Sequence, residues 1–388
     1  MVYISLISRH RYHELIHEKD SNMTSYSTQW PMSLFMLCLS IIATLFFVSC
    51  EQVTPLGPCT SLSIPVSLEE GTAKDFNVEG QLCWNRDQSN QTLQVLSHGA
   101  GYGPIYWDFP YKPEIYSYVE ASMKEDYATF NFARLGVGES SIPTAADLSI
   151  EKDAFVLHQV IEALQEHGVK YKHPWGKIVT VGHSMGSIIT MVHAIQYPDD
   201  IQGIILTGFV HHVNAEYVRA NIAMQVQAQE DPLFTQRELG EGYISSTLEG
   251  RSAFYVTEKA ESEVITLDYE TREPVSLSEI FGIRKYYDEG AEQLKVPVLQ
   301  VIGDQDFIGC GTSLDNIVLD CTNTEEVVAR ERERFASQTC LETVVIAEAG
   351  HVLNLQIQAP TIYQSMFDWL NRRIGSSPTQ TVPSPCLP

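Results

Sequence analysis

The sequence predicts an α/β protein with a doubly wound, mainly parallel sheet of eight strands and an inserted, largely helical cap. Apolar runs of strand length alternate with stretches of helical periodicity, as expected when helices bury both faces of a parallel sheet. One connection, over about residues 210–295, is too long for a simple crossover, so we expect the cap there. The main domain spans residues 51–375, and a Pro/Ser/Thr-rich tail, residues 376–388, follows it.

The elements follow from the spacing of apolar residues along the chain. The expected strands are residues 62–70, 76–85, 92–99, 127–136, 177–184, 203–209, 296–304 and 343–351. A helix is expected over residues 149–168, whose apolar residues recur at helical spacing. The last helix begins at Pro360 and ends at Gly375, because proline suits a first helical turn and glycine a helix end. Within the cap, residues 215–231 are predicted to form a further helix.

Composition narrows the choice of partners. Hydrophobic residues make up 44% of the chain and charged residues 19%, which is typical of a packed globular protein. The 25 Lys and Arg against 49 Asp and Glu give a formal net charge of −24. A surface this acidic repels phosphate backbones, so no nucleic-acid partner is expected. Neutral substrates are favoured over strongly anionic ones for the same reason.

The N-terminal region predicts export. Residues 32–50 form an uncharged, strongly apolar stretch that suits a signal peptide better than a membrane span of roughly 20 apolar residues. Residues 1–31 form an extension that is long for a signal peptide, unless translation starts at Met23 or Met32. We expect a secreted protein. The alternatives are membrane anchoring through an uncleaved 32–50 segment and a buried core helix.

Cysteine usage agrees with export. Outside the targeting segment six cysteines could form three disulfides: Cys59, Cys83, Cys310, Cys321, Cys340 and Cys386. Cys59 and Cys83 flank the first predicted hairpin, and Cys310 and Cys321 enclose a short loop, so these two pairings are expected. The alternative is a set of buried thiols, since cysteine packs well as a small apolar residue. The sequon at Asn90 would carry a glycan in a eukaryotic secretory route.

The stretch KIVTVGHSMGSII, residues 177–189, suggests a nucleophilic serine. Ser184 lies where a strand ends and helical spacing begins, with Gly182 and Gly186 on either side. Such glycines permit the sharp turn that projects a serine hydroxyl above a sheet. The positive end of the following helix favours negative charge developing there. The alternative is a pair of glycines that only mark a tight turn, since G-x-S-x-G often occurs by chance.

The loop LSHGAGYG, residues 96–103, suggests an oxyanion hole. Small residues end the strand here, so a backbone N–H can lie beside the serine. We expect the N–H groups of Ala100 and Met185 to stabilise the oxyanion of a tetrahedral intermediate. A nucleotide-binding interpretation of these glycines fails, because their spacing differs from the dinucleotide fingerprint and no helical pattern follows.

Two later strands end with residues that suit an acid and a base. VPVLQVIGDQDFIG, residues 296–309, carries Asp304 and Asp306 after a strand, and His351 follows the last strand. A carboxylate in such a place can orient a histidine that acts first as general base and then as general acid. Asp306 is preferred and Asp304 is the alternative. Both are solvated loop residues if the site is not catalytic.

The remaining histidines are assigned lesser roles. His98 and His183 adjoin glycine turns, which explain their positions by backbone geometry. His211 and His212 open the cap, where a structural role is favoured over one in lining the substrate cavity. HELIH, residues 13–17, matches the zinc-protease pattern but precedes the targeting segment, and no third ligand can be assigned. No metal site is therefore expected.

Together these features resemble the α/β-hydrolase superfamily over roughly residues 60–375. Ser184, Asp306 and His351 follow in the order nucleophile, acid and base, and the insertion separates the sixth and seventh strands. GHSMG is similar to the family's nucleophile elbow, HGAG to its oxyanion loop, and GDQDFIG to its G-x-x-D turn, which favours Asp306. ARLGVGESS is similar to the segment D-R-x-G-x-G-x-S, but Ala133 replaces the aspartate, a departure that touches loop structure.

The resemblance implies acyl hydrolysis by Ser184, His351 and Asp306 through an acyl enzyme, without a metal or an organic cofactor. A serine nucleophile argues against the dehalogenase and epoxide-hydrolase branches. The expected substrate is a small neutral or apolar ester or lactone. Serine aminopeptidase or amidase activity is an alternative, although HGAGYG departs from the H-G-G-P-G of proline iminopeptidases. The same fold could also serve a non-catalytic ligand-binding protein or an anchored surface protein.

Overall fold

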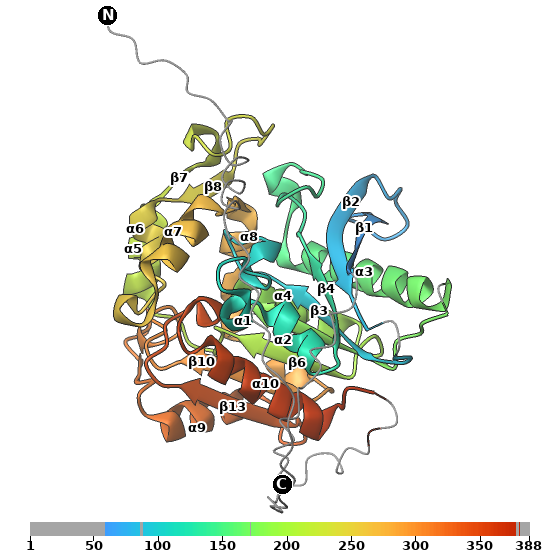
Figure 1. The fold of residues 1–388 in the computed structure, drawn as a ribbon. Coiled ribbons are helices and arrows are strands. Elements are labelled where there is room, and N and C mark those ends of the chain that lie inside the picture. Colours follow the sequence, from blue (N-terminus) through green and yellow to red (C-terminus); the bar gives the residue numbers. More distant parts are fainter. Residues whose placement is uncertain (1–58, 86–87, 171, 378–379, 381–388) are drawn as a thin grey trace, which may run out of the picture. The chain divides into compact units, whose positions relative to one another are not determined.

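The computed structural model describes residues 59–85, 88–170, 172–377 and 380, and Figure 1 shows how their elements are arranged. All of them belong to one compact unit, Thr54–Pro388. The predicted N-terminal extension, the targeting segment, the HELIH motif and Cys386 lie outside the described residues. Within the described part of the chain, no helix is long and apolar enough to cross a bilayer.

The predicted eight-stranded, mainly parallel sheet is confirmed, with strand order β1-β2-β4-β3-β5-β6-β10-β13. Only the β1–β2 and β2–β4 pairs are antiparallel. The strands are β1 (Cys59–Val66), β2 (Phe76–Cys83), β3 (Thr92–Ser97), β4 (Ala128–Phe132), β5 (Lys177–His183), β6 (Gly203–Thr207), β10 (Val298–Gly303) and β13 (Leu341–Ile346). The carboxyl ends of the parallel strands meet at one edge, where the loops after β3, β5, β10 and β13 lie close together.

Helices cover both faces of the sheet (Figure 1). The long helices α3 (Ile150–Lys170) and α4 (Met185–Gln196) pack on one face, and α2 (Tyr118–Lys124) and α10 (Ala359–Arg373) pack on the other. Strand alternation supplies both cores: Ile204 and Leu206 of β6 face the first group of helices, while Ile205 between them faces the second. Helices α3, α4 and α10 are the helices predicted outside the cap.

The cap lies between β6 and β10, as predicted, and it combines helices with a small sheet. It contains the helices α5 (Ala215–Ala223), α6 (Leu248–Ser252), α7 (Ser262–Glu270) and α8 (Leu277–Gly282), and a three-stranded sheet of β7 (Gln225–Gln227), β8 (Tyr243–Ser246) and β9 (Val275–Ser276). The helix predicted over 215–231 ends at Ala223, because Gln225 and Val226 pair with residues of β8. This pairing is non-local, so the helical spacing of the segment gave no sign of it.

Both predicted disulfides are present. Cys59 bonds to Cys83 at the end of the β1–β2 pair, where the two residues are register partners. Cys310 bonds to Cys321 across a short loop, and Cys340 is also disulfide-bonded. The alternative of buried free thiols is therefore wrong for these five residues.

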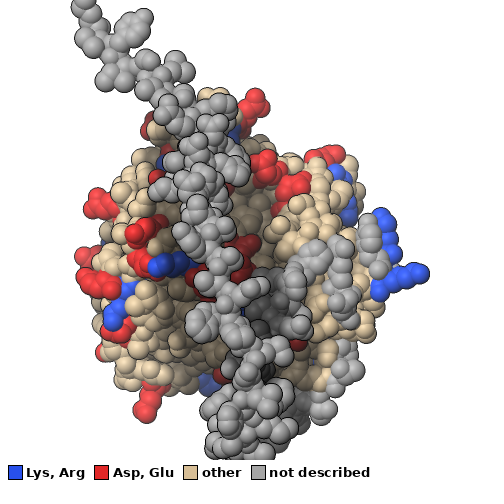
Figure 2. Space-filling model, in the orientation of Figure 1, with Lys and Arg blue, Asp and Glu red and all other residues tan. Residues whose placement is uncertain are grey.

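The acidic composition is spread over the surface. Figure 2 shows Asp and Glu side chains scattered over the visible face, with Lys and Arg between them. Many of these charges are paired with each other, as Lys112 is with Glu261 and Lys285 with Glu151.

Candidate active site

The turn between β5 and α4 holds Ser184 in a strained conformation. Its φ of 55° and ψ of −120° are unfavourable for a residue with a side chain, at a cost of about 1–3 kcal/mol that surrounding contacts must offset. A Cβ on Gly182 would lie 2.4 Å from the Gly186 oxygen, and one on Gly186 would lie 2.2 Å from the Ser97 oxygen. Only glycine fits at either position. This is the geometry expected of a nucleophile elbow.

The loop after β3 lies directly against this turn. A Cβ on Gly99 would be 3.1 Å from the Ser184 Cβ, and Ala100 lines the same cavity as Ser184 and Met185. Met185 is the first residue of α4, and N–H groups in a first helical turn have no acceptor within their helix. The structure therefore brings both residues predicted for the oxyanion hole beside Ser184.

The imidazole of His351 forms a hydrogen bond with Asp306. The His351 Nδ1 lies 2.9 Å from the Asp306 Oδ2, and the two side chains are 3% and 0% exposed. Engagement of Nδ1 leaves Nε2 as the nitrogen that can accept a proton. Asp304 makes no such contact, and burial raises the pKa of its carboxyl. The structure therefore brings Asp306, and not Asp304, to His351.

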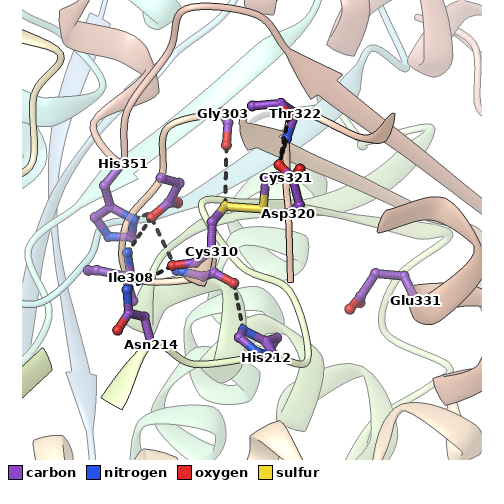
Figure 3. Close-up of a disulfide and its surroundings, with 12 residues drawn as sticks. His212, Asn214, Gly303, Ile308, Cys310, Asp320, Cys321, Thr322, Glu331 and His351 are labelled. Atoms are coloured by element: carbon purple, nitrogen blue, oxygen red, sulfur yellow. Dashed lines mark hydrogen bonds and ion pairs between the residues drawn. A yellow bond between two sulfur atoms is a disulfide. The ribbon is translucent and has the colours of Figure 1, made fainter. Parts of the chain in front are cut away.

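The loop after Asp306 fixes the carboxylate. Backbone N–H groups of Ile308 and Gly309 donate to its Oδ1 at 3.1 and 3.4 Å, and the N–H of Cys310 donates to its carbonyl oxygen at 2.8 Å. The Cys310–Cys321 disulfide then closes the loop, as Figure 3 shows. These bonds orient the carboxylate toward His351.

A cavity of about 400 Å³ lies over these residues and beneath the cap. Ser184, Met185, Ala100 and His351 line it together with mostly apolar side chains: Val213, Val218, Ile222, Ile244, Phe254, Val275, Ile280, Phe281, Ile283, Ile308 and Leu314. Ile222 and Phe281 are 38% and 68% exposed and therefore lie at its mouth. Among the described residues that line this cavity, none is Asp or Glu, and the charged ones are Arg219 and Arg284, both exposed.

Arg251 of α6 connects the cap to the oxyanion loop. Its guanidinium is buried, donates from Nη1 to the Gly101 oxygen at 2.8 Å, and lies 3.5 Å from the centre of the Tyr102 ring. Nε and Nη2 donate to both oxygens of Asp268, at 2.9 and 2.8 Å. Burial opposes the charge on Arg251, but the Asp268 carboxylate raises its pKa above the ordinary value, so the pair is ionic. Sequence reasoning missed Arg251, because no local pattern marks an arginine that becomes buried.

The same part of the cap holds the loop that carries His351. The N–H of His351 donates to the Phe254 oxygen at 3.0 Å, and the two rings lie 5.3 Å apart. Residues 251–254, which we call the cap brace, therefore fasten the cap to the oxyanion loop and to the histidine loop at once. The brace sets the distance between the two sides of the cavity.

The position of Ala133 gives a second contact with the cap. Its carbonyl accepts the hydroxyl of Ser140 at 2.8 Å, and the next residue, Arg134, pairs with Glu279 of α8. The segment that carries Ala133 therefore contacts both its own loop and the cap. Arg134 is not in the lining of the cavity that holds Ser184.

Two further buried histidines, His98 and His183, lie near the site, and their contacts agree with the structural roles expected of them. Burial lowers the pKa of His98 and of His183 well below the usual range, so both rings are neutral near pH 7. The backbone N–H of Arg134 donates to the His98 Nε2 at 3.2 Å. The ring of His183 stacks on Tyr106 with centroids 4.3 Å apart.

His211 and His212 line a neighbouring cavity of about 450 Å³ and not the cavity of Ser184. The His211 Nδ1 lies 2.7 Å from the Glu331 Oε2 on α9 (Thr324–Arg334). The His212 Nδ1 lies 2.9 Å from the Gly309 oxygen, beside the disulfide loop in Figure 3. Their contacts agree with the structural role favoured for them.

Comparison with known proteins assigns the family. The model of the family described as serine aminopeptidase, S33, matches residues 116–324, which is more than half of the chain. The chain belongs to this family. It is a hydrolase of the α/β-hydrolase superfamily, as its motifs predicted. The matched residues include Ser184 and Asp306 but end before His351.

Solved structures agree on the fold of this α/β hydrolase. An esterase from Thermogutta terrifontis is 18% identical, with a TM-score of 0.53 over 80% of this chain and 98% of that one. An esterase from Exiguobacterium antarcticum is 15% identical, with a TM-score of 0.55 over 80% of this chain and 99% of that one. An enol-lactonase from Burkholderia xenovorans is 15% identical, with a TM-score of 0.50 over 76% and 96%. No curated protein matches the sequence.

Proposed function

We propose that this α/β hydrolase cleaves a small neutral carboxylic ester or lactone through an acyl enzyme. Ser184 attacks the carbonyl carbon while His351 takes its proton, and Asp306 orients the imidazole and stabilises its positive charge. The N–H groups of Ala100 and Met185 stabilise the oxyanion. His351 then gives the proton to the leaving alcohol and activates the water that releases the acyl group.

The main support for this mechanism is the position of Ser184 and His351 relative to one another. The strained Ser184 and the Asp306-bound His351 come from different strand ends, yet both line a single cavity. A serine held at a φ of 55° without a function would be an uncompensated cost. An Nδ1 that donates to Asp306 leaves Nε2 as the proton acceptor of the imidazole.

The lining of the cavity supports an apolar acyl or alcohol group. Apolar side chains from α5, β8 and α8 of the cap cover the site, and Phe281 continues them to the mouth of the cavity. Burying such a group contributes about 25 cal/mol for each Å² of apolar surface removed from water. The esterase and enol-lactonase names of the structural neighbours point to the same bond types.

Aminopeptidase activity is the second candidate, because the family description names it. An aminopeptidase must bind the charged amino group of its substrate, which calls for a carboxylate in the cavity. The described residues that line the cavity offer none, and Arg219 and Arg284 at its edge would repel an ammonium group. The ester or lactone assignment is therefore favoured.

Labelling with a fluorophosphonate, followed by peptide mass spectrometry, tests the nucleophile. We expect the label on Ser184, its loss in Ser184→Ala, and its retention in Ser246→Ala, since Ser246 is a second serine in the same cavity. A chain-length series of neutral esters and lactones, run beside amino-acid anilides, then ranks the bond types. Label on another residue, or saturable binding of the esters without multiple turnover, would favour a ligand-binding protein instead.

We also propose that the protein is exported. The Cys59–Cys83 and Cys310–Cys321 disulfides support this, because disulfides persist mainly in oxidising compartments. Sequencing the N-terminus of protein recovered from the medium tests the proposal. Removal of residues 32–50 is expected, whereas an intact N-terminus in the membrane fraction would favour the anchored form.

A further inference from the structure

Helix α3 packs against α4 on one face of the sheet (Figure 1). Three side chains that can bind a metal gather at this contact, outside the cavity of Ser184. His158 lies on α3, His193 in the last turn of α4, and Asp200 in the turn that leads to β6. The Asp200 Oδ2 lies 2.7 Å from the His158 Nδ1 and 3.0 Å from the His193 Nε2. All three donor atoms lie within 4.8 Å of one another.

The chain holds these side chains in place. The His158 ring stacks on Tyr197, with centroids 4.0 Å apart and planes 7° from parallel. The N–H of Asp200 donates to the carbonyl oxygen of the same Tyr197 at 3.2 Å, so one residue positions both ligands. His193 is fully buried, whereas the side chains of His158 and Asp200 are 21% and 18% exposed. Solvent therefore reaches the cluster from one side.

We propose that His158, His193 and Asp200 bind a divalent transition-metal ion, for which Zn²⁺ is the best match. Two imidazoles and one carboxylate, with water in the fourth position, form a ligand set typical of zinc. Bonds of about 2.0–2.2 Å place the ligand atoms of a tetrahedral zinc site about 3.3 Å apart. The observed separations of 2.7 and 3.0 Å are slightly shorter than that value, and the third pair of ligand atoms lies within 4.8 Å. Ångström-scale movement of the two part-exposed ligands is sufficient.

A second carboxylate lies on the far side of one of the two imidazoles. Binding through the His158 Nδ1 places its proton on Nε2, which lies 3.7 Å from the Glu162 carboxylate. Such a carboxylate is the usual outer partner of a metal-bound histidine.

The ion would link the two long helices on one face of the sheet. Helix α4 begins directly after Ser184 and ends beside the cluster, so the ion would brace the helix that follows the nucleophile. None of the three ligands lines the cavity of Ser184. An ion bound there would stabilise the folded chain without touching the cavity, so it should raise the thermal midpoint of unfolding and leave kcat and KM unchanged.

Metal titration of the chelator-treated, full-length protein tests the proposal. We expect one equivalent of Zn²⁺ by calorimetry, a four-coordinate Co²⁺ absorption spectrum, and a Zn²⁺-dependent rise in thermal midpoint. His158→Gln and Asp200→Asn should each weaken binding by about tenfold or more. Both positions are part exposed, and Asp200→Asn keeps the size of the side chain. If one of these variants fails to fold, the affinity of the other variant and the Co²⁺ spectrum of the wild type still test whether the three residues bind the ion.

Two matched variants remove the competing explanations. His167→Gln changes a histidine on the same helix, and His13→Gln/His17→Gln removes the HELIH pattern, so both should keep the full affinity and the thermal shift. The proposal is overturned if the wild type binds no stoichiometric Zn²⁺ at micromolar concentration. It is equally overturned if His158→Gln and Asp200→Asn bind as the wild type does, or if only the HELIH variant loses binding.

Discussion

Two buried imidazole–carboxylate pairs lie near the carboxyl edge of the sheet, and they differ in what surrounds them. His351 meets Asp306 at 2.9 Å and lines the cavity that contains Ser184. His211 meets Glu331 at 2.7 Å and lines the neighbouring cavity. Both bonds run from Nδ1 to a carboxylate, and all four side chains are at most 3% exposed.

The surroundings decide what each pair can do. The rings of Phe209 and Phe335 pack against His211 at 5.0 and 5.3 Å, and its Nε2 is buried without a hydrogen-bond partner among the described residues. Glu331 also accepts the amide of Gln300, at 2.6 Å, so it acts as a structural junction. An imidazole–carboxylate bond fixes a tautomer in both places, but only His351 shares a cavity with a serine on a strained turn.

Replacing the carboxylates of Asp306 and Glu331 in turn should separate a loss of catalysis from a loss of stability. Asp306→Asn is expected to lower kcat by about 10⁴-fold, because the amide favours the wrong imidazole tautomer. Glu331→Gln should leave kcat unchanged and lower the free energy of unfolding by about 1–3 kcal/mol, through hydrogen bonds left unmade. Ester hydrolysis and urea denaturation of both variants measure this. Equal losses of kcat would show that the two pairs do not differ in role.

Among the described residues, the cap contains two buried arginine–aspartate ion pairs, and only one of them contacts the oxyanion loop. Arg251→Met removes the contact with Gly101 and is expected to lower kcat by about 100-fold, through displacement of the oxyanion loop. It also leaves Asp268 buried without its partner, at a cost of about 3–5 kcal/mol in unfolding free energy. Arg272→Met is the matched control, because Arg272 forms a similar ion pair with Asp231 in the cap and does not line the cavity.

The control variant Arg272→Met should lower the free energy of unfolding but leave kcat per folded molecule unchanged. The double variant Arg251→Met/Asp268→Asn should recover part of the stability and none of the rate. If the rate returns together with the stability, Arg251 has no positioning role.

Two of the buried histidines have no carboxylate partner among the described residues, and their burial should make the free energy of unfolding depend on pH. His98 and His183 have pKa values well below the 6.5 of an unfolded chain, so the unfolded state binds more protons below that pH. The free energy of unfolding should therefore fall as the pH drops from 7 to 5.5, by up to about 1.4 kcal/mol per pH unit for each imidazole. Denaturant titrations at fixed ionic strength measure it, and a stability that rises over this range would contradict the assignment.

Much of the fold could be predicted because its signals are local. The buried strands are short apolar runs, α3 has helical spacing, and the glycines around Ser184 mark a turn that only they permit. Asp306 could be preferred over Asp304 from the G-x-x-D pattern, and the structure places it against His351.

The rest depends on contacts between residues that are distant in sequence. The β7–β8–β9 sheet of the cap forms by pairing across more than one turn, so helical spacing over 215–231 was misleading. Arg251 is an ordinary charged residue until Asp268, Gly101 and the Tyr102 ring surround it. The same holds for His158 and Asp200, which lie on different elements.

Locating the acyl group during turnover identifies the nucleophile most directly. An activated ester is mixed with the wild-type protein, quenched in acid within one turnover, and the adduct is mapped by peptide mass spectrometry. We expect the acyl group on Ser184, and a loss of kcat/KM of about 10⁶-fold in folded Ser184→Ala. Hydrolysis that persists in Ser184→Ala, or an acyl group on any other residue of the wild type, would contradict it.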